Sequence, residues 1–126
     1  MTLTVLNVAY PLAPVGPDAV GGAEQVMSAL DRALVEKGHR SVVVACQGSS
    51  TAGVLVETPA EAGVLDEAAK DRAQRAHRDA IAAARACWAI DVVHLHGIDF
   101  DAYLPSDGPT LVTLHLPLGW YPPEVL

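Results

Sequence analysis

The most constraining feature of this sequence is a pair of short, continuous apolar segments that are separated by a glycine-bearing loop and a helix. Leu3–Ala9 and Ser41–Cys46 are both short and rich in β-branched or leucine residues, which predicts two strands. Strands whose apolar residues do not alternate with polar ones are buried on both faces, as in a parallel sheet. The sequence therefore predicts a right-handed βαβ unit at its start.

The segment between these two strands has the spacing of an amphipathic helix. Apolar residues recur every three or four positions over Gly22–Lys37, and we expect the charged residues Glu24, Asp31 and Glu36 on the opposite side of the helix. Gly38 follows, and a glycine in the left-handed conformation commonly ends a helix.

The rest of the chain continues the alternation of strands and helices. Helical propensity dominates Ala60–Ala89, and a short helix or loop is expected around Asp99–Leu104. Three further strands are predicted at Gly53–Thr58, Ile90–Leu95 and Thr110–Leu114. This pattern predicts an α/β fold with a doubly wound, mostly parallel, Rossmann-like sheet that has helices on both faces.

Length, charge and hydropathy restrict the kind of protein. The 126 residues suit one domain, and 8 basic against 15 acidic side chains give a net charge of −7, which disfavours nucleic acid and anionic membranes as partners. No apolar run approaches the ~20 residues that span a bilayer, and no basic residue precedes the apolar N-terminus, so we expect no signal peptide. We expect a soluble, cytoplasmic protein in which Cys46 and Cys87 are buried, reduced thiols.

Three segments concentrate unusual residues at the expected carboxyl ends of strands, where α/β sheets bind ligands. The first runs from Tyr10 to Glu24 and carries Gly16, Gly21 and Gly22 just before the helix. Glycines at a helix N-terminus expose backbone N–H groups that favour an anion such as phosphate, although a turn needing positive φ is an alternative explanation. The spacing matches neither the dinucleotide fingerprint nor the nucleoside-triphosphate P-loop.

The second segment places two histidines at one strand end. His94 and His96 are expected on the same face, because side chains alternate along a strand. Three interpretations stay open: two packed histidines, a substrate-facing His96, or metal ligands together with Asp99. The last is disfavoured, because Asp99 comes one residue too late for the corresponding hydrolase motif and no cysteine pair or HExxH completes a site.

The third segment ends with His115 after the predicted strand Thr110–Leu114, which we expect to be central in the sheet. An imidazole with an ordinary pKa of ~6.5 donates or accepts near neutral pH, so His115 suits a ligand site, although a structural role at the strand end is the alternative. Trp120 and Tyr121 follow, and they suit an aromatic wall or a packing surface.

Taken together, these segments resemble the N-terminal domain of a family-4 glycosyltransferase, the retaining type with two Rossmann domains (GT-B). The resemblance covers most of the chain, with Gly63–Trp88 matching only as a helix. Its matching pieces are Gly21–Glu24, Lys37–His39, Asp91–Gly97 and Thr113–His115.

The resemblance implies transfer of a sugar, with retention, from a nucleotide-sugar donor to a small-molecule or glycan acceptor, with no cofactor and no protein-bound metal. It places Gly21 and Gly22 beside the donor diphosphate, His115 at the reacting sugar as the catalytic residue, and Tyr10 and His96 toward the acceptor. The leaving diphosphate gains negative charge, which a helix N-terminus with free N–H groups stabilises.

The resemblance also implies that residues 1–126 form a truncated, acceptor-side domain without the C-terminal nucleotide-sugar domain. We then expect an incomplete sheet, no catalysis by the fragment alone, and self-association through apolar residues near its end, namely Leu116, Leu118, Trp120 and Val125. Two alternatives stay open: a stand-alone, flavodoxin-like module that binds an anion or a protein, and a metal-dependent hydrolase that uses His94, His96 and Asp99.

Overall fold

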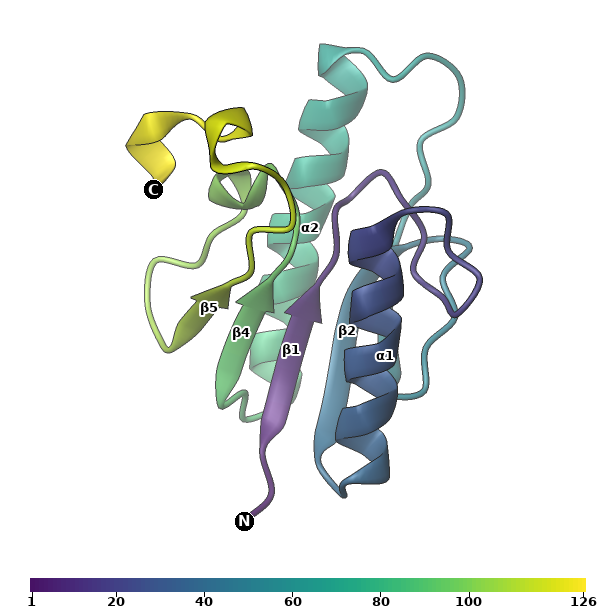
Figure 1. Ribbon diagram of the computed structural model, residues 1–126, viewed down its shortest axis with the longest axis vertical. Helices are drawn as coiled ribbons and strands as arrows, with labels where there is room; N and C mark the ends of the chain where they lie inside the picture. The colour runs from purple at the N-terminus through teal and green to yellow at the C-terminus, as the bar shows by residue number, and fades with distance from the viewer.

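Five parallel strands form one sheet in the order β3-β2-β1-β4-β5 in the computed structural model, which describes residues 1–126 (Figure 1). The strands are β1 (Thr4–Val8), β2 (Arg40–Cys46), β3 (Val54–Thr58), β4 (Val92–Leu95) and β5 (Thr110–Val112). The chain moves outward from β1 to β3 and then returns to the other side of β1 at β4, so the sheet is doubly wound. The predicted α/β, Rossmann-like fold is confirmed.

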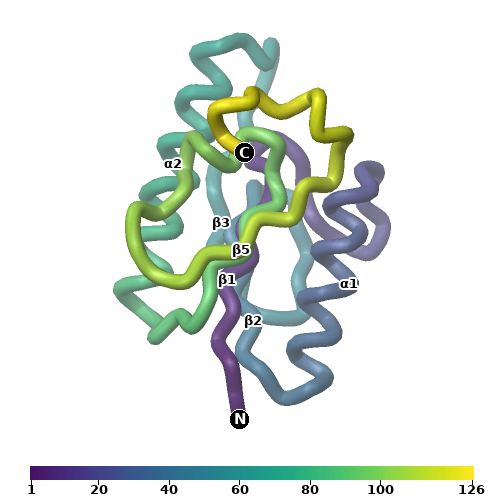
Figure 2. Tube along the Cα trace, turned by 60° about the vertical axis from the view of Figure 1, so that its left-hand side comes forward, coloured from purple at the N-terminus to yellow at the C-terminus, as the bar shows by residue number.

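Two helices cover opposite faces of this sheet, as predicted: α1 (Gly22–Glu36) and α2 (Glu67–Cys87) (Figures 1 and 2). Alternate residues of each strand point to opposite faces of the sheet and pack in different core clusters. Leu6 and Val8 of β1 pack in the cluster that contains Ile81 of α2, whereas Val43 of β2 packs with Met27 of α1. Both faces of the central strands are therefore buried, which explains their continuous apolar sequences.

Helix α1 ends just before Gly38, as the sequence predicts. Gly38 has φ +84°, and its N–H donates to the Val35 carbonyl at 3.0 Å while the N–H of His39 donates to the Leu34 carbonyl at 2.9 Å. These two bonds form a Schellman motif, and the left-handed conformation they require is strained for any residue with a Cβ atom.

The predicted orientation of α1 is wrong at two charged positions. Glu24 and Asp31, expected opposite the packed face, are only 8 % and 2 % exposed, whereas the apolar Val26 is 51 % exposed. The Asp31 carboxylate is buried because the Ser41 hydroxyl and the backbone N–H groups of Ala52 and Gly53 donate to it. Apolar spacing does not reveal partners that come from other elements.

Several boundaries also differ from the sequence prediction. The helix expected over Ala60–Ala89 starts only at Glu67, because the Asp66 side chain caps it by accepting from the Ala69 N–H at 2.9 Å. Cys87, expected to be buried, is exposed at the end of α2, whereas Cys46 is buried.

Strand β5 differs most in position, because it forms an edge of the sheet rather than its centre and stops at Val112. His115 therefore lies beyond the strand, in the segment that leads to three-residue 3₁₀ helices at Leu118–Trp120 and Pro123–Val125. A third such helix, Phe100–Ala102, occupies the expected short helix or loop after β4. None of the helices combines the length and apolar character needed to cross a bilayer.

Candidate functional site

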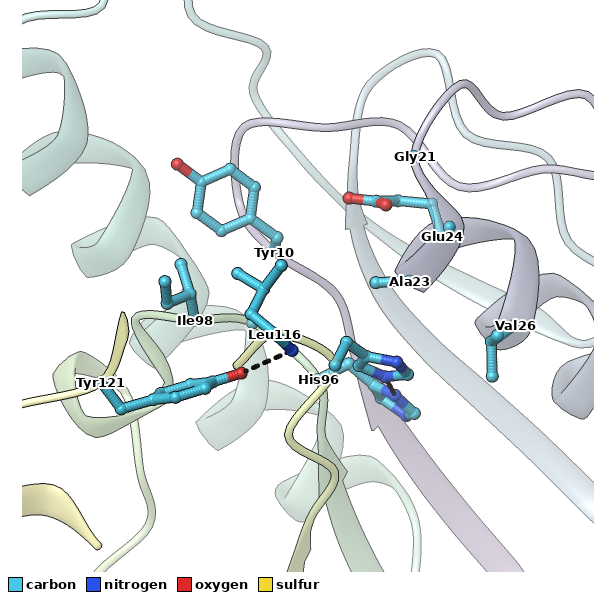
Figure 3. A pocket seen from close by; sticks show the side chains of 12 residues that line it. Tyr10, Gly21, Ala23, Glu24, Val26, His96, Ile98, Leu116 and Tyr121 are labelled. Atoms are coloured by element: carbon cyan, nitrogen blue, oxygen red, sulfur yellow. Dashed lines mark hydrogen bonds between the residues drawn. The ribbon is translucent and has the colours of Figure 1, made fainter. Parts of the chain in front are cut away.

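A pocket of about 530 Å³ lies at the carboxyl ends of β1 and β4, where the strand order reverses (Figure 3). Crevices at this point of an open α/β sheet are where ligands of such folds bind. The three segments singled out in the sequence all contribute to its lining. All five sequence-predicted site residues are among the lining residues: Tyr10, Gly21, Gly22, His96 and His115.

One side of the pocket is the N-terminus of α1. Gly21 is the N-cap residue, and no side chain caps the helix, so the first backbone N–H groups have no side-chain partner. A Cβ atom on Gly22 would have no heavy atom within 4 Å, whereas one on Gly21 would collide with the Glu24 carboxylate, so the space is open beside Gly22 and partly filled beside Gly21. The uncapped N–H groups favour an anionic group such as a phosphate, and the Glu24 carboxylate in the same turn opposes one.

The conformations of these glycines exclude the simpler explanation of a turn. Positive φ values occur at Gly38, Gly48, Gly63 and Gly108, and neither Gly21 nor Gly22 has one. A need for the left-handed conformation therefore does not account for the glycine pair.

Three histidines lie side by side here, and two of them, His96 and His115, line the pocket. His94 and His96 share a face as predicted, with ring centroids 3.9 Å apart, and the ring of His115 stacks beside His96 at 5.3 Å with an interplanar angle of 24°. Edge strand β5 brings His115 here because it pairs with β4, placing Thr113 beside His94, where the Thr113 hydroxyl and His94 Nε2 are 2.6 Å apart.

A chain of hydrogen bonds connects His115 through His96 to Asn7 in the central strand β1. His96 Nδ1 lies 3.0 Å from His115 Nε2, and His96 Nε2 lies 3.0 Å from the side-chain oxygen of Asn7 in β1. Burial, together with the neighbouring His94 and His115, lowers the pKa of His96 to about 3. Burial, together with His115, also lowers the pKa of His94. Both rings are therefore neutral near pH 7.

Asp99 does not join the two histidines of the metal-hydrolase alternative. Its carboxylate accepts hydrogen bonds from the Tyr103 hydroxyl at 2.7 Å and from the Gln74 amide at 3.0 Å. Burial raises the pKa of this carboxyl group. No group of three or more His, Cys, Asp or Glu side chains, the three neighbouring histidines included, is arranged so that it could hold a metal ion, so this alternative lacks a ligand set.

The remaining lining residues surround the pocket from two sides. Figure 3 shows Glu24 and Val26 of α1 opposite Tyr10, Leu116 and Tyr121. The Tyr121 hydroxyl accepts a hydrogen bond from the Leu116 N–H at 3.4 Å and so holds the chain directly after His115.

Sequence reasoning missed part of this site. Of the proposed aromatic wall only Tyr121 joins the pocket, since Trp120 is 64 % exposed and does not line it. Asn7 and Glu24 were not expected to contribute. The sequence alone could have indicated a role for Asn7, because Asn7 is the only amide side chain in the largely apolar segment Leu3–Ala9.

Comparison with known proteins gives one family. The family model described as Glycosyltransferase Family 4 matches residues 20–125. A comparison with curated proteins gave no match.

Proposed function

This chain belongs to Glycosyltransferase Family 4, and from that premise we propose that it is the acceptor-side, Rossmann-like domain of a retaining, GT-B type enzyme. The proposed reaction transfers a sugar from a nucleotide-sugar donor to a small-molecule or glycan acceptor. In this reaction the bond between the anomeric carbon and the diphosphate oxygen breaks. The acceptor oxygen bonds to that carbon, and the acceptor's proton passes to the diphosphate.

One observation carries the proposal: a single pocket at the topological switch of the sheet is lined by Tyr10, Gly21, Gly22, His96 and His115 together. These residues come from segments far apart in the sequence, and the pocket offers them to one ligand. A site with a phosphate-binding helix N-terminus, an imidazole and a tyrosine suits a reaction between a sugar diphosphate and a hydroxyl group.

We assign the donor diphosphate to the first turn of α1. No side chain caps the backbone N–H groups at Gly21 and Gly22. These groups stabilise the negative charge that develops on the leaving diphosphate, and the helix dipole adds to this stabilisation. Because the net charge of the chain is −7, the anion is held by local backbone dipoles rather than by the overall field of the chain.

We assign the catalytic role at the reacting sugar to His115 and the acceptor side to Tyr10 and His96. His115 is only half-buried and lines the pocket, whereas both nitrogens of His96 have partners within the protein. His96 therefore presents its ring to the pocket rather than a free nitrogen, and Tyr10 supplies the hydroxyl on this side.

The test is His115→Ala in the full-length natural protein, assayed for sugar transfer. We expect turnover to fall by ~10²-fold or more, because a group that positions the reacting sugar is lost, with the fold retained. His39→Ala is the matched control, because His39 lies at the amino end of the sheet, where its Nδ1 accepts from the Leu3 N–H, and turnover should stay near the wild-type value. Wild-type turnover in His115→Ala would overturn the catalytic assignment.

Retention is tested separately by proton NMR of the anomeric proton of the glycoside product. A product with the anomeric configuration of the donor supports the retaining mechanism. The opposite configuration would overturn retention while leaving the sugar-transfer function intact.

A further inference from the structure

We propose that Asn7 and His96 are positioning residues that fix the tautomer of His115, so that Nε2 carries its proton and Nδ1 is left as a hydrogen-bond acceptor. The tautomer follows from the hydrogen-bond chain within the protein. That Nδ1 then accepts from a hydroxyl group of the bound carbohydrate rests on the proposed function.

The first link is the side chain of Asn7. Asn7 is fully buried in the central strand β1, directly opposite His94 in the register of β1 and β4. Its side-chain oxygen lies 3.0 Å from His96 Nε2, and an amide oxygen only accepts hydrogen bonds. His96 Nε2 must therefore carry a proton and donate it to this bond.

The second link is the neutral state of His96. Because burial holds its pKa at about 3, the ring carries a single proton at neutral pH. With that proton on Nε2, His96 Nδ1 is an acceptor. His115 Nε2 lies 3.0 Å from this acceptor, so it is the donor of the second bond.

The third link is the free nitrogen of His115. A neutral imidazole that donates from Nε2 has an unprotonated Nδ1, and the structure gives this nitrogen no partner within the protein. The Tyr121 hydroxyl accepts a hydrogen bond from the N–H of Leu116, the residue after His115, and this bond restrains the backbone next to the imidazole. His115 thus meets the pocket with a defined acceptor, and a ligand need not select one tautomer from a mixture.

These hydrogen bonds also explain why a polar residue, Asn7, occupies the largely apolar strand β1. A buried amide is costly in an apolar environment unless it forms hydrogen bonds. Its one bond goes to His96, and its Nδ2 has no partner. Leucine or valine would pack here at lower cost, so a role in orienting the histidines accounts for Asn7 better than packing does.

The test is a long-range proton–nitrogen correlation spectrum of the ¹⁵N-labelled wild-type protein at pH 7.5, which reports the protonated nitrogen of each imidazole without any substrate. We expect the proton on Nε2 in both His96 and His115, with a nitrogen–nitrogen coupling across the bond between them. A proton on Nδ1 of either ring, or averaged signals from two tautomers of His115, would overturn the proposal.

Asn7→Leu extends the test, because leucine matches the amide in size and offers no acceptor. We expect the single set of His115 nitrogen signals to be replaced by an average of both tautomers. Thr113→Val is the matched control, because it removes the hydrogen-bond partner of His94, which does not belong to the chain of hydrogen bonds from Asn7 to His115. The tautomer of His115 should be unchanged in this variant.

A His115 tautomer that is unaffected by Asn7→Leu would overturn the positioning role, since a purely structural asparagine would behave in that way. If Asn7→Leu does not fold, the wild-type spectrum still decides the tautomer. These readouts do not depend on sugar transfer, so the proposal and the proposed function can fail independently.

Discussion

Glycines at the pocket differ in what a side chain would meet there. A Cβ atom on Gly22 would point into open space, whereas one on Gly97 would run into the Tyr103 hydroxyl and lie only 2.7 Å from Asp99 Oδ1 and 3.3 Å from the Tyr10 Cα. Gly97 therefore lets the chain after β4 pass close to β1 and to the Asp99–Tyr103 hydrogen bond. This close approach brings Tyr10 and His96 to the same pocket.

We predict that Gly97→Ala lowers the free energy of unfolding by about 1–3 kcal/mol, because the added methyl group overpacks a site that includes backbone atoms. Urea denaturation measures this loss. Gly119→Ala is the control, since a Cβ atom there has no neighbour within 4 Å, and its stability should match the wild type. An equally stable Gly97→Ala would show that the chain shifts at no cost.

At the scale of elements, α1 is fixed to the sheet by a buried carboxylate as well as by its apolar face. Asp31 Oδ1 accepts from the Ser41 hydroxyl at 2.6 Å and from the Gly53 N–H at 3.1 Å, while Oδ2 accepts from the Ala52 N–H at 2.7 Å. One side chain thus connects the middle of α1 to the start of β2 and to the turn before β3. The position of α1 in turn sets where Gly21 and Gly22 face the pocket.

We predict that Asp31→Ala destabilises the protein by about 1–3 kcal/mol, because the buried Ser41 hydroxyl loses its acceptor, whereas the Ala52 and Gly53 N–H groups are only partly buried and can bond to water. Denaturation by urea checks this value. Glu36→Ala, on the exposed end of the same helix, should change stability by no more than about 0.5 kcal/mol. Equal stabilities for the two variants would contradict an anchoring role for Asp31.

The other helix, α2, is fixed by a buried histidine. His77 is fully buried, and its Nε2 donates to the Ala9 carbonyl at 2.9 Å, just beyond β1. Its ring packs edge-on against Tyr103, with centroids 5.2 Å apart. Burial lowers the pKa of His77 to about 4, although the bond to Ala9 opposes this shift. The ring is therefore neutral when the protein is folded near pH 7.

This buried base makes the stability of the whole molecule depend on pH. Between the ordinary histidine pKa of ~6.5 and about 4, the unfolded chain binds a proton at His77 that the folded protein excludes. The contribution of His77 is fully present above pH ~6.5 and is lost as the pH falls toward 4. His96 acts in the same direction down to about pH 3, whereas Asp99, with its raised pKa, acts in the opposite direction.

We predict that the free energy of unfolding falls by up to about 1.4 kcal/mol per pH unit through His77 alone between pH 6.5 and 4. Urea denaturation across this range, compared with His77→Gln, isolates the contribution, because glutamine keeps a donor for the Ala9 carbonyl and does not titrate. The variant should show a shallower decline. The same slope in both proteins would rule out His77 as the source.

Much of this fold follows from the sequence alone. Continuous apolar strands at both ends of a βα unit require burial on two faces, so Leu6, Val8, Val42 and Val44 predict a parallel sheet with helices on either side. Gly38 likewise marks the end of α1, because its conformation is a local property of the chain. The candidate site residues were also identifiable, since parallel strands bring their carboxyl ends to one edge.

The tertiary structure alone decided which way polar groups face and what they meet. Asp31 and Glu24 occupy helix positions that look solvent-exposed, and only Ser41 and the turn before β3 explain why Asp31 is buried. The edge position of β5 and the bonds from Asn7 through His96 to His115 join residues up to 89 positions apart. Periodicity reports a residue's own element, whereas hydrogen-bond partners and pKa values depend on groups that folding brings from elsewhere.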